Sequence, residues 1–373
     1  MMKKPKLLYV LTASRSIKLL DGQLEYMAAR GYEVHLITTP GEEIRYLSEN
    51  IHFHALSMER EISILKDIKA LFHILKLMRQ IKPDIINYGT PKASLIASIT
   101  AKICKVPKRI YTMRGLRLET ITGFKKRFLI WIEKRICQCS DEIICVSPSL
   151  LEKVAELKLA KQSKLYCIKS GSSNGLNIDK FQNMDIEEEQ IPLITAEDQV
   201  VGYVGRLTKD KGIDDLVDSF ILIQDQFPKL KLLLVGKLEK NHGLKANTVI
   251  QMRLQRNIIH LDFQKNIAPL YRKMHVFVLP TYREGFANVA MEAAYSRLPV
   301  ITTNVTGAKD AIINGETGLL VSAKKPEALA EAIKHLLENP EKAREMGSLG
   351  RHRIEAEFKR ETIWEGLIAI YQF

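Results

Sequence analysis

The sequence lacks the features that mark several large classes of protein. No apolar run approaches the ~20 residues that a membrane-spanning helix needs, and the polar residues Thr12, Ser14 and Arg15 interrupt the first apolar run too early for a signal peptide. Five cysteines in 373 residues, without CxxC spacing, indicate reduced thiols in a cytosolic protein and not a disulfide framework. With 46% apolar and 27% charged residues, a disordered or fibrous chain is excluded.

Acidic residues are scarce in the first half of the chain. Residues 1–180 hold 31 Lys and Arg against 17 Asp and Glu, whereas residues 181–373 hold 25 against 26. An asymmetry of this size indicates that the first half faces an anionic partner, which could be nucleic acid, an anionic membrane or a phosphorylated substrate. A solvated basic face without a partner is the alternative.

Short apolar runs alternate with helical patterns along the whole chain. Alternating strands and helices are typical of a parallel sheet that is covered by helices on both faces. We therefore predict the α/β class, with two Rossmann-like domains that face a cleft. The expected strands are 7–11, 34–37, 52–56, 85–87, 109–111 and 143–146 in the first half, and 199–204, 232–235, 258–261, 276–279, 300–302 and 318–321 in the second.

The boundaries follow from composition. An acidic stretch without clear period, which contains Pro192, predicts a linker at 183–198 between an N-terminal domain at 1–182 and a C-terminal domain at 199–358. The apolar helix expected at 359–373 needs a surface to cover, and we expect it to cross back to the N-terminal domain. Since ligands of open α/β sheets bind outside the carboxyl ends of the strands, we expect the site in the cleft between the two domains.

The first strand of the second half is followed by a glycine turn with two cations. Gly205 and Arg206 come directly after the strand, and Lys211 precedes the next helix. Backbone amides, a helix N-terminus and two positive charges favour an anion, so this loop predicts a phosphate site. It is not a Walker A loop, and an ordinary solvated turn is the alternative.

Two glutamates flank the helix start after the strand at 276–279. Glu284 precedes a helix that we expect to begin near Asn288, and Glu292 follows two turns later. Residues 285–288 would present free backbone amides to an anion or a hydroxyl group, and a carboxylate can accept two hydrogen bonds from a vicinal diol. A chance pair of acids at this spacing is the alternative in a chain with 43 of them.

These motifs resemble those of a known family. Glu284-Gly285-Phe286 with Glu292 resembles the EX7E motif of the retaining glycosyltransferases of family 4, which have the GT-B fold. The segment 205–212 is similar to their G-R-L-x-x-x-K-G element, and 314–321 is similar to their N-G-x-x-G-x-L-V segment. The resemblance covers essentially the whole chain.

The resemblance implies a role for each matching residue. Arg206 and Lys211 would bind the diphosphate of a nucleotide-sugar donor, and Glu284 would contact hydroxyl groups of its sugar. Glu292 would accept hydrogen bonds from the ribose. The remaining donor-binding residues that it implies are Gly205, Gly285, Phe286, Ala287, Asn288 and Val289 around the phosphates and sugar, with Leu261 and Phe263 near the base.

The N-terminal half resembles one subgroup of the family, through 30–34, 58–62, 90–93, 114–117 and 171–175. Members of this subgroup add an N-acetylhexosamine or related sugar to an acceptor linked to undecaprenyl diphosphate. The residues implied on the acceptor or sugar side are Arg114, Glu59, Arg60 and Lys92, although Glu59 could equally form a loop ion pair. Arg114 stands where many relatives have a histidine, and its guanidinium can donate hydrogen bonds but cannot act as a base.

A basic and aromatic segment points to a membrane surface. Residues 101–135 hold 11 Lys and Arg against two acids, and 125–127 are all basic beside Phe124, Phe128 and Trp131. Such a segment is typical of an anionic interface, so we expect a peripheral protein on the inner face of the plasma membrane. The alternative is that Phe128, Leu129 and Ile132 face the domain core.

We therefore predict a glycosyltransferase that uses a nucleotide-sugar, expected to be a UDP-sugar, without a metal ion or other cofactor. The acceptor would be a polyprenyl-diphosphate-linked saccharide in surface polysaccharide or glycan assembly. Two alternatives stay open at this point. A UDP-sugar epimerase would share the architecture, and a nucleic-acid-binding protein would explain the basic half, although no helix-turn-helix, RNP or zinc spacing supports it.

Overall fold

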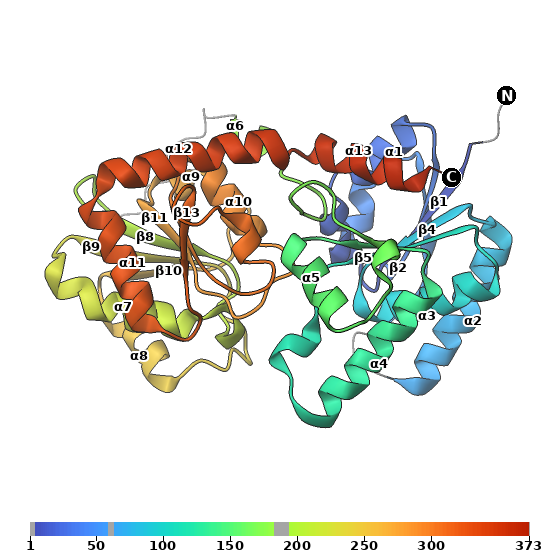
Figure 1. The fold of residues 1–373 in the computed structure, drawn as a ribbon, viewed down its shortest axis with the longest axis horizontal. Helices are drawn as coiled ribbons and strands as arrows, with labels where there is room; N and C mark the ends of the chain where they lie inside the picture. The colour runs from blue at the N-terminus through green and yellow to red at the C-terminus, as the bar shows by residue number, and fades with distance from the viewer. Residues whose placement is uncertain (1–3, 59–62, 183–193, 373) are drawn as a thin grey trace. The chain divides into compact units, whose positions relative to one another are not determined.

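The computed structural model describes residues 4–58, 63–182 and 194–372, and it divides into two compact units (Figure 1). Unit 1 comprises residues 1–175 with 360–373, and unit 2 comprises residues 176–359. Most of the linker expected at 183–198 lies outside the described residues. Residues 176–182 belong with unit 2, since the amide of Leu176 donates to the carbonyl of Phe358 and the ring of Phe181 packs on Tyr295.

Unit 1 is built on a seven-stranded sheet in which every strand is parallel to its neighbours, in the order β3-β2-β1-β4-β5-β6-β7. The strands are β1 (Lys6–Val10), β2 (Glu33–Thr38), β3 (Ile51–Ala55), β4 (Ile85–Tyr88), β5 (Lys108–Met113), β6 (Glu142–Cys145) and β7 (Leu165–Tyr166). The central strands are apolar along their length because helices cover both faces of the sheet.

The helices of unit 1 are α1 (Gln23–Ala29), α2 (Ile64–Ile81), α3 (Pro91–Ile103), α4 (Gly123–Cys139), α5 (Pro148–Glu156) and α13 (Arg360–Tyr371). Figure 1 shows α2, α3 and α4 side by side, with α3 packed between the other two. On the opposite face, α13 lies beside α1 and buries Ile363, Trp364 and Leu367 in the same core as Leu24 and Met27.

Unit 2 repeats this plan with six parallel strands in the order β10-β9-β8-β11-β12-β13. The strands are β8 (Gln199–Val204), β9 (Leu230–Val235), β10 (Ile258–Leu261), β11 (Val276–Leu279), β12 (Val300–Thr303) and β13 (Gly318–Val321). The helices are α6 (Asp179–Gln182), α7 (Ile213–Ile223), α8 (Ala246–Leu254), α9 (Ala268–Arg272), α10 (Asn288–Tyr295), α11 (Pro326–Glu338) and α12 (Pro340–Glu357).

The prediction of two parallel α/β sheets is confirmed. In each sheet the strand order reverses beside the first strand, between β1 and β4 in unit 1 and between β8 and β11 in unit 2. Loops that leave neighbouring strands diverge at such a reversal, and ligands of doubly wound folds bind there. None of the described helices is both long and apolar enough to cross a membrane, and all five cysteines are free.

Candidate functional site

The loop after β8 begins with a close approach of two backbones. The carbonyl of Gly205 lies against Gly236, the residue after β9, and a Cβ at position 236 would stand 2.0 Å from that oxygen. The hydroxyl group of Tyr203 donates to the carbonyl of Arg206 at 2.9 Å. These contacts hold the glycine turn at the carboxyl edge of the sheet and leave the Arg206 side chain exposed.

The loops after β8 and β11 are joined by their backbones. The amide of Tyr282 donates to the carbonyl of Asp210 at 2.9 Å. Gly212 adopts a φ of 71°, and a Cβ there would lie 1.9 Å from the carbonyl oxygen of Pro280. Only glycine fits this left-handed, crowded position, so it fixes the entry to α7 against the end of β11.

This junction brings Lys211 and Glu284 together, 73 positions apart in the chain. Their side chains form an ion pair and are 15% and 17% exposed, respectively. Beside them, Nη2 of Arg283 lies 4.0 Å from Oδ2 of Asp210. Burial alone would raise the pKa of Asp210, but the hydrogen bond that it accepts from Thr208 and the nearby cations hold the pKa below its ordinary value. Lys211 and Arg283 therefore each have an acid of the same site as partner.

The N-terminus of α10 lies next to this pair. The helix begins at Asn288, as the sequence predicts, and no acceptor among the described residues bonds the amides of Gly285, Phe286, Ala287 and Val289. Gly307, with a φ of 75°, approaches the loop so closely that a Cβ would lie 2.4 Å from the carbonyl oxygen of Gly285. The unsatisfied amides form a site suited to an anion or a hydroxyl oxygen.

Glu292 lies one turn into α10 and is tied to α9. The hydroxyl group of Tyr271 donates to its Oε2 at 2.9 Å. Burial raises the pKa of Glu292 to about 7, although the Tyr271 hydrogen bond and the charge of Lys180 act in the opposite direction. One donor is few for a carboxylate in this setting, so a diol that supplied further hydrogen bonds would stabilise its charged form.

Two predicted base-binding residues lie at the end of β10, at the same edge of the sheet, since Leu261 is its last residue and Phe263 follows it. The carbonyl of Leu261 accepts from the amide of Gly236, which joins the ends of β10 and β9. Phe263 is 70% exposed. An exposed ring at the carboxyl edge can stack on a planar base.

The acceptor-side residues are spread over unit 1. Lys92, in the first turn of α3, forms an ion pair with Asp67 of α2 at 2.7 Å. Arg114 follows β5 and is largely buried. Glu59 and Arg60 lie outside the described residues.

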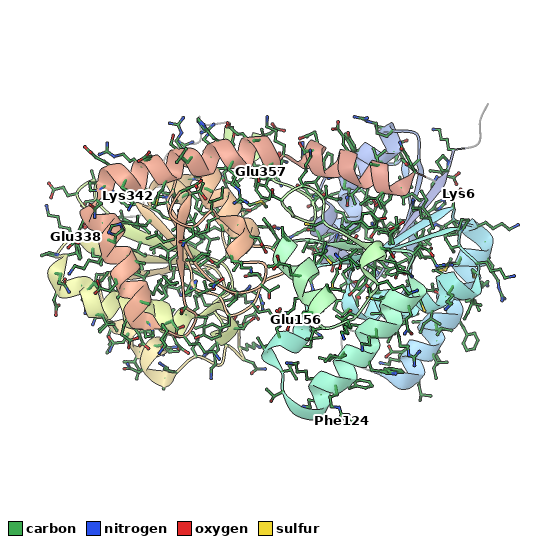
Figure 2. The ribbon with its side chains drawn as sticks, in the orientation of Figure 1. Lys6, Phe124, Glu156, Glu338, Lys342 and Glu357 are labelled. Carbon is green, nitrogen blue, oxygen red and sulfur yellow. The ribbon has the colours of Figure 1, made fainter. Side chains whose placement is uncertain are left out.

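The basic helix α4 carries its aromatic residues on the outside. Its inner face is fixed by Glu133, which accepts a hydrogen bond from Tyr111 at 2.9 Å, and by the buried Ile136. Its exposed aromatic side chains are Phe124, Phe128 and Trp131. Phe124, at the helix start, is 83% exposed (Figure 2). The alternative that Phe128 faces the core is therefore wrong, whereas Leu129 and Ile132 are partly buried.

The sequence analysis missed several residues of these sites. Tyr271, Asp210 and Gly307 act through contacts between distant segments, and only Gly307 carried a signal, as a glycine just before the similar segment at 314–321. A second exposed apolar stripe was also missed. It lies on α2 and consists of Leu65, Ile68 and Phe72.

Two family models match the chain. The model of glycosyl transferases group 1 matches residues 184–353, and the model named glycosyl transferase 4-like matches residues 6–147. The first covers the loops that carry Arg206, Lys211, Glu284 and Glu292 in unit 2.

Curated relatives resemble the chain over most of its length. The capsular polysaccharide biosynthesis glycosyltransferase CapM of Staphylococcus aureus is 41% identical, with 99% of this chain and 97% of CapM covered. The UDP-Gal:alpha-D-GlcNAc-diphosphoundecaprenol alpha-1,3-galactosyltransferase of Escherichia coli is 24% identical, with 83% and 81% covered. Among solved structures, HepE of Anabaena in complex with UDP has a TM-score of 0.80 at 16% identity, with 98% of this chain and 99% of HepE covered.

Proposed function

The chain belongs to the group 1 glycosyltransferases of family 4, with the GT-B fold, and on this premise we propose its reaction. It transfers an N-acetylhexosamine or related sugar, with retention, from a UDP-sugar to a saccharide linked to undecaprenyl diphosphate in capsular polysaccharide assembly. The name of CapM supports the pathway, and the name of the Escherichia coli galactosyltransferase supports the UDP-sugar donor and the lipid carrier. Membership of this family favours transfer over the two alternatives, an epimerase and a nucleic-acid-binding protein.

One observation carries the proposal for the donor. Unit 2 gathers Lys211, Glu284, the free amides before α10 and the largely buried Glu292 at the carboxyl edge of one sheet. A UDP-sugar needs positive charge for its diphosphate and acceptors for its sugar and ribose hydroxyl groups, and these residues provide both.

Departure of the diphosphate builds negative charge on the leaving group. Arg206 and Lys211, with the amides of 285–287, would stabilise this charge, so the proposal includes no metal ion. Lys211 would leave its ion pair with Glu284 for the diphosphate, and the released carboxylate would then accept hydrogen bonds from the donor sugar. We assign no general base, because retention places attack and departure on the same face of the sugar.

The acceptor requires a position at a membrane surface. The exposed stripes of α2 and α4 belong to helices that pack on the two sides of α3. Lys66, Lys69, Lys125 and Arg127 lie on the same helices, and each cation near an anionic surface contributes about 1 kcal/mol to binding. We propose that these two helices hold the enzyme on the anionic inner face of the plasma membrane.

A transfer assay tests the reaction. Purified protein is incubated with a panel of UDP-sugars, with and without a saccharide linked to undecaprenyl diphosphate, and released UDP is measured. Release that requires the lipid-linked acceptor supports the proposal, and mass spectrometry of the lipid product identifies the sugar. Conversion of a UDP-sugar into its epimer without any acceptor would contradict it.

A further inference from the structure

Arg114 is a largely buried cation without a counter-ion. Its Nε is inaccessible to solvent and bonds no acceptor, and no carboxylate forms an ion pair with its guanidinium among residues 4–58, 63–182 and 194–372. An unpaired charge inside a protein is costly, so buried cations are normally paired with acids. Arg109, a partly buried arginine of the same sheet with a side chain 22% exposed, is paired with an acid, since it binds Asp141 at 2.5 Å.

The groups around Arg114 supply no negative charge. Tyr9, Tyr111 and Tyr371 lie near enough to act on it, but burial raises the pKa of each hydroxyl, to about 12 for Tyr371, so all three are neutral at physiological pH. Each hydroxyl group also makes a hydrogen bond to another residue. Tyr9 and Tyr371 are bonded to each other at 3.0 Å, and Tyr111 donates to Glu133.

The backbone leaves space for the guanidinium at the end of β4. A Cβ at Gly89, the residue after the strand, would lie 2.1 Å from Nη1 of Arg114. The guanidinium therefore lies across the bare backbone of Gly89, at the carboxyl edge of the sheet and beside the reversal of strand order between β1 and β4. This is the edge at which ligands of such sheets bind, and α3 begins two residues later with its positive end there.

From the unpaired charge and this position we propose that Arg114 binds an oxyanion of a substrate, a phosphate or a carboxylate group, at the carboxyl edge of unit 1. The inference rests on the proposed function for the identity of the substrates. Two sources share this chemistry: the diphosphate of the lipid-linked acceptor and the carboxylate of a uronic acid donor. The N-terminal ends of α2 and α4, with Leu65 and Phe124 exposed, lie toward this edge of the sheet and favour the lipid diphosphate.

A binding experiment tests the site without any transfer. Hydrogen exchange of the full chain is followed by mass spectrometry with and without inorganic diphosphate, so that the loops after β4 and β5 are read separately from the loops of unit 2. We expect protection of residues 89–94 and 112–118 in the wild type, and loss of this protection in Arg114→Met. Arg117→Met, which removes an exposed cation from the same loop, is the matched control and should retain it.

Stability without ligand separates a binding role from a structural one. Replacing an uncompensated buried charge by an apolar side chain of similar length should leave the melting temperature unchanged or raise it. A clear fall in the melting temperature of Arg114→Met, with diphosphate protection unchanged, would overturn the proposal.

Kinetics identify the source of the oxyanion. The value of kcat/KM is compared for two acceptors with the same saccharide, one linked to farnesyl diphosphate and one linked to an uncharged octyl group. It is also compared for UDP-sugar donors with and without a carboxylate at carbon 6 of the sugar. We expect Arg114→Gln to lower kcat/KM by about 10- to 100-fold with the diphosphate acceptor alone, as for a lost charge-assisted hydrogen bond. A loss that follows the carboxylate donor assigns the second source, and an equal loss with every substrate would contradict both. Absence of transfer in the wild type, with diphosphate protection intact, would instead disprove the proposed function.

Discussion

The two units share one topology but carry their charge in different ways. In unit 2 two cations of the site are paired with acids, Lys211 with Glu284 and Arg283 with Asp210. Unit 1 has an excess of cations, a buried arginine without a partner and aromatic residues exposed on a basic helix. We propose from this difference that unit 2 is preorganised for the soluble donor, which would exchange with internal partners, whereas unit 1 would bind anionic groups of the acceptor or the membrane.

The largest effect should come from the ion pair of unit 2. Lys211→Ala removes the cation that we assign to the leaving diphosphate, and we expect kcat to fall by about 10²- to 10³-fold, as for other single donors to a developing anion. Lys209→Ala, an exposed lysine in the same loop, should change kcat less than threefold. Equal losses in initial-rate assays of the two variants would show that the paired lysine has no special role.

The exposed aromatic residues of unit 1 should control membrane binding. Replacing Phe124, Phe128 and Trp131 by serine should reduce binding to phosphatidylglycerol vesicles by at least about tenfold in a sedimentation assay, because the apolar side chains no longer enter the interface. The matched control replaces Leu222, Ile250 and Leu254, three exposed apolar residues of unit 2, by serine. If both triple variants lose binding equally, the membrane surface is not confined to unit 1.

The close contact of Gly307 with the loop before α10 gives a prediction for which Gly315 is the control. Gly307 and Gly315 both have positive φ, but only a Cβ at 307 would collide with the carbonyl of Gly285. We expect Gly315→Ala to cost about 1–2 kcal/mol of folding stability from φ alone. Gly307→Ala should cost more and also lower kcat/KM for the donor about tenfold or more, because 284–285 must move. Indistinguishable variants in urea unfolding and in kinetics would contradict this account of the loop.

Most of the fold could be predicted because apolar runs and helical spacing depend on local sequence. The alternating strands and helices and the start of α10 at Asn288 follow from that pattern, whereas the strand order is known from the structure alone. The pairing of Lys211 with Glu284 could not be predicted, since it depends on the contact of Gly212 with Pro280 across two loops. The apolar spacing of Leu65, Ile68 and Phe72 is typical of a buried helix face, so only the structure reveals that this stripe is exposed.

Glu292 should make donor binding depend on pH. Burial raises its pKa to about 7, and ribose hydroxyl groups would bind the ionised form, so affinity should weaken as the pH falls through 7. We expect the Kd of UDP-glucose, whose diphosphate does not titrate in this range, to rise about tenfold or less between pH 8 and pH 6 in calorimetry. In Glu292→Gln the Kd should be higher at pH 8 and nearly independent of pH. A wild-type Kd that stays constant would place the ribose elsewhere.

The smallest effect concerns the stability of unit 1. His35 Nδ1 and His54 Nε2 lie 3.0 Å apart, and the ring of His52 stacks on His35. Burial lowers the pKa of His35 and His54, even though Glu33 opposes the shift at His35. The folded state therefore favours the neutral rings, so the stability they contribute is present above the ordinary histidine pKa of about 6.5 and is lost as the pH falls below it.

Burial raises the pKa of Glu133, in the same unit, to about 7, which stabilises unit 1 as the pH falls, so the histidine contribution is read as the difference in unfolding free energy between the wild type and a variant with His35→Gln and His54→Gln. We expect this difference to fall by roughly 1 kcal/mol between pH 7 and pH 5.5. Both tryptophans of the chain, Trp131 and Trp364, lie in unit 1, so urea unfolding followed by tryptophan fluorescence reports on this unit. A difference between wild type and variant that does not change with pH would show that the histidine cluster does not titrate on unfolding.

The proposal that unit 2 binds the donor and unit 1 binds the acceptor is tested most directly by initial rates. The concentrations of donor and lipid-linked acceptor are both varied for Arg206→Ala and Arg114→Gln. We expect Arg206→Ala to raise the KM of the UDP-sugar and leave that of the acceptor within twofold. Arg114→Gln should do the reverse. If the unit 1 variant raised the donor KM as much as the unit 2 variant does, the assignment of donor and acceptor to separate units would be wrong.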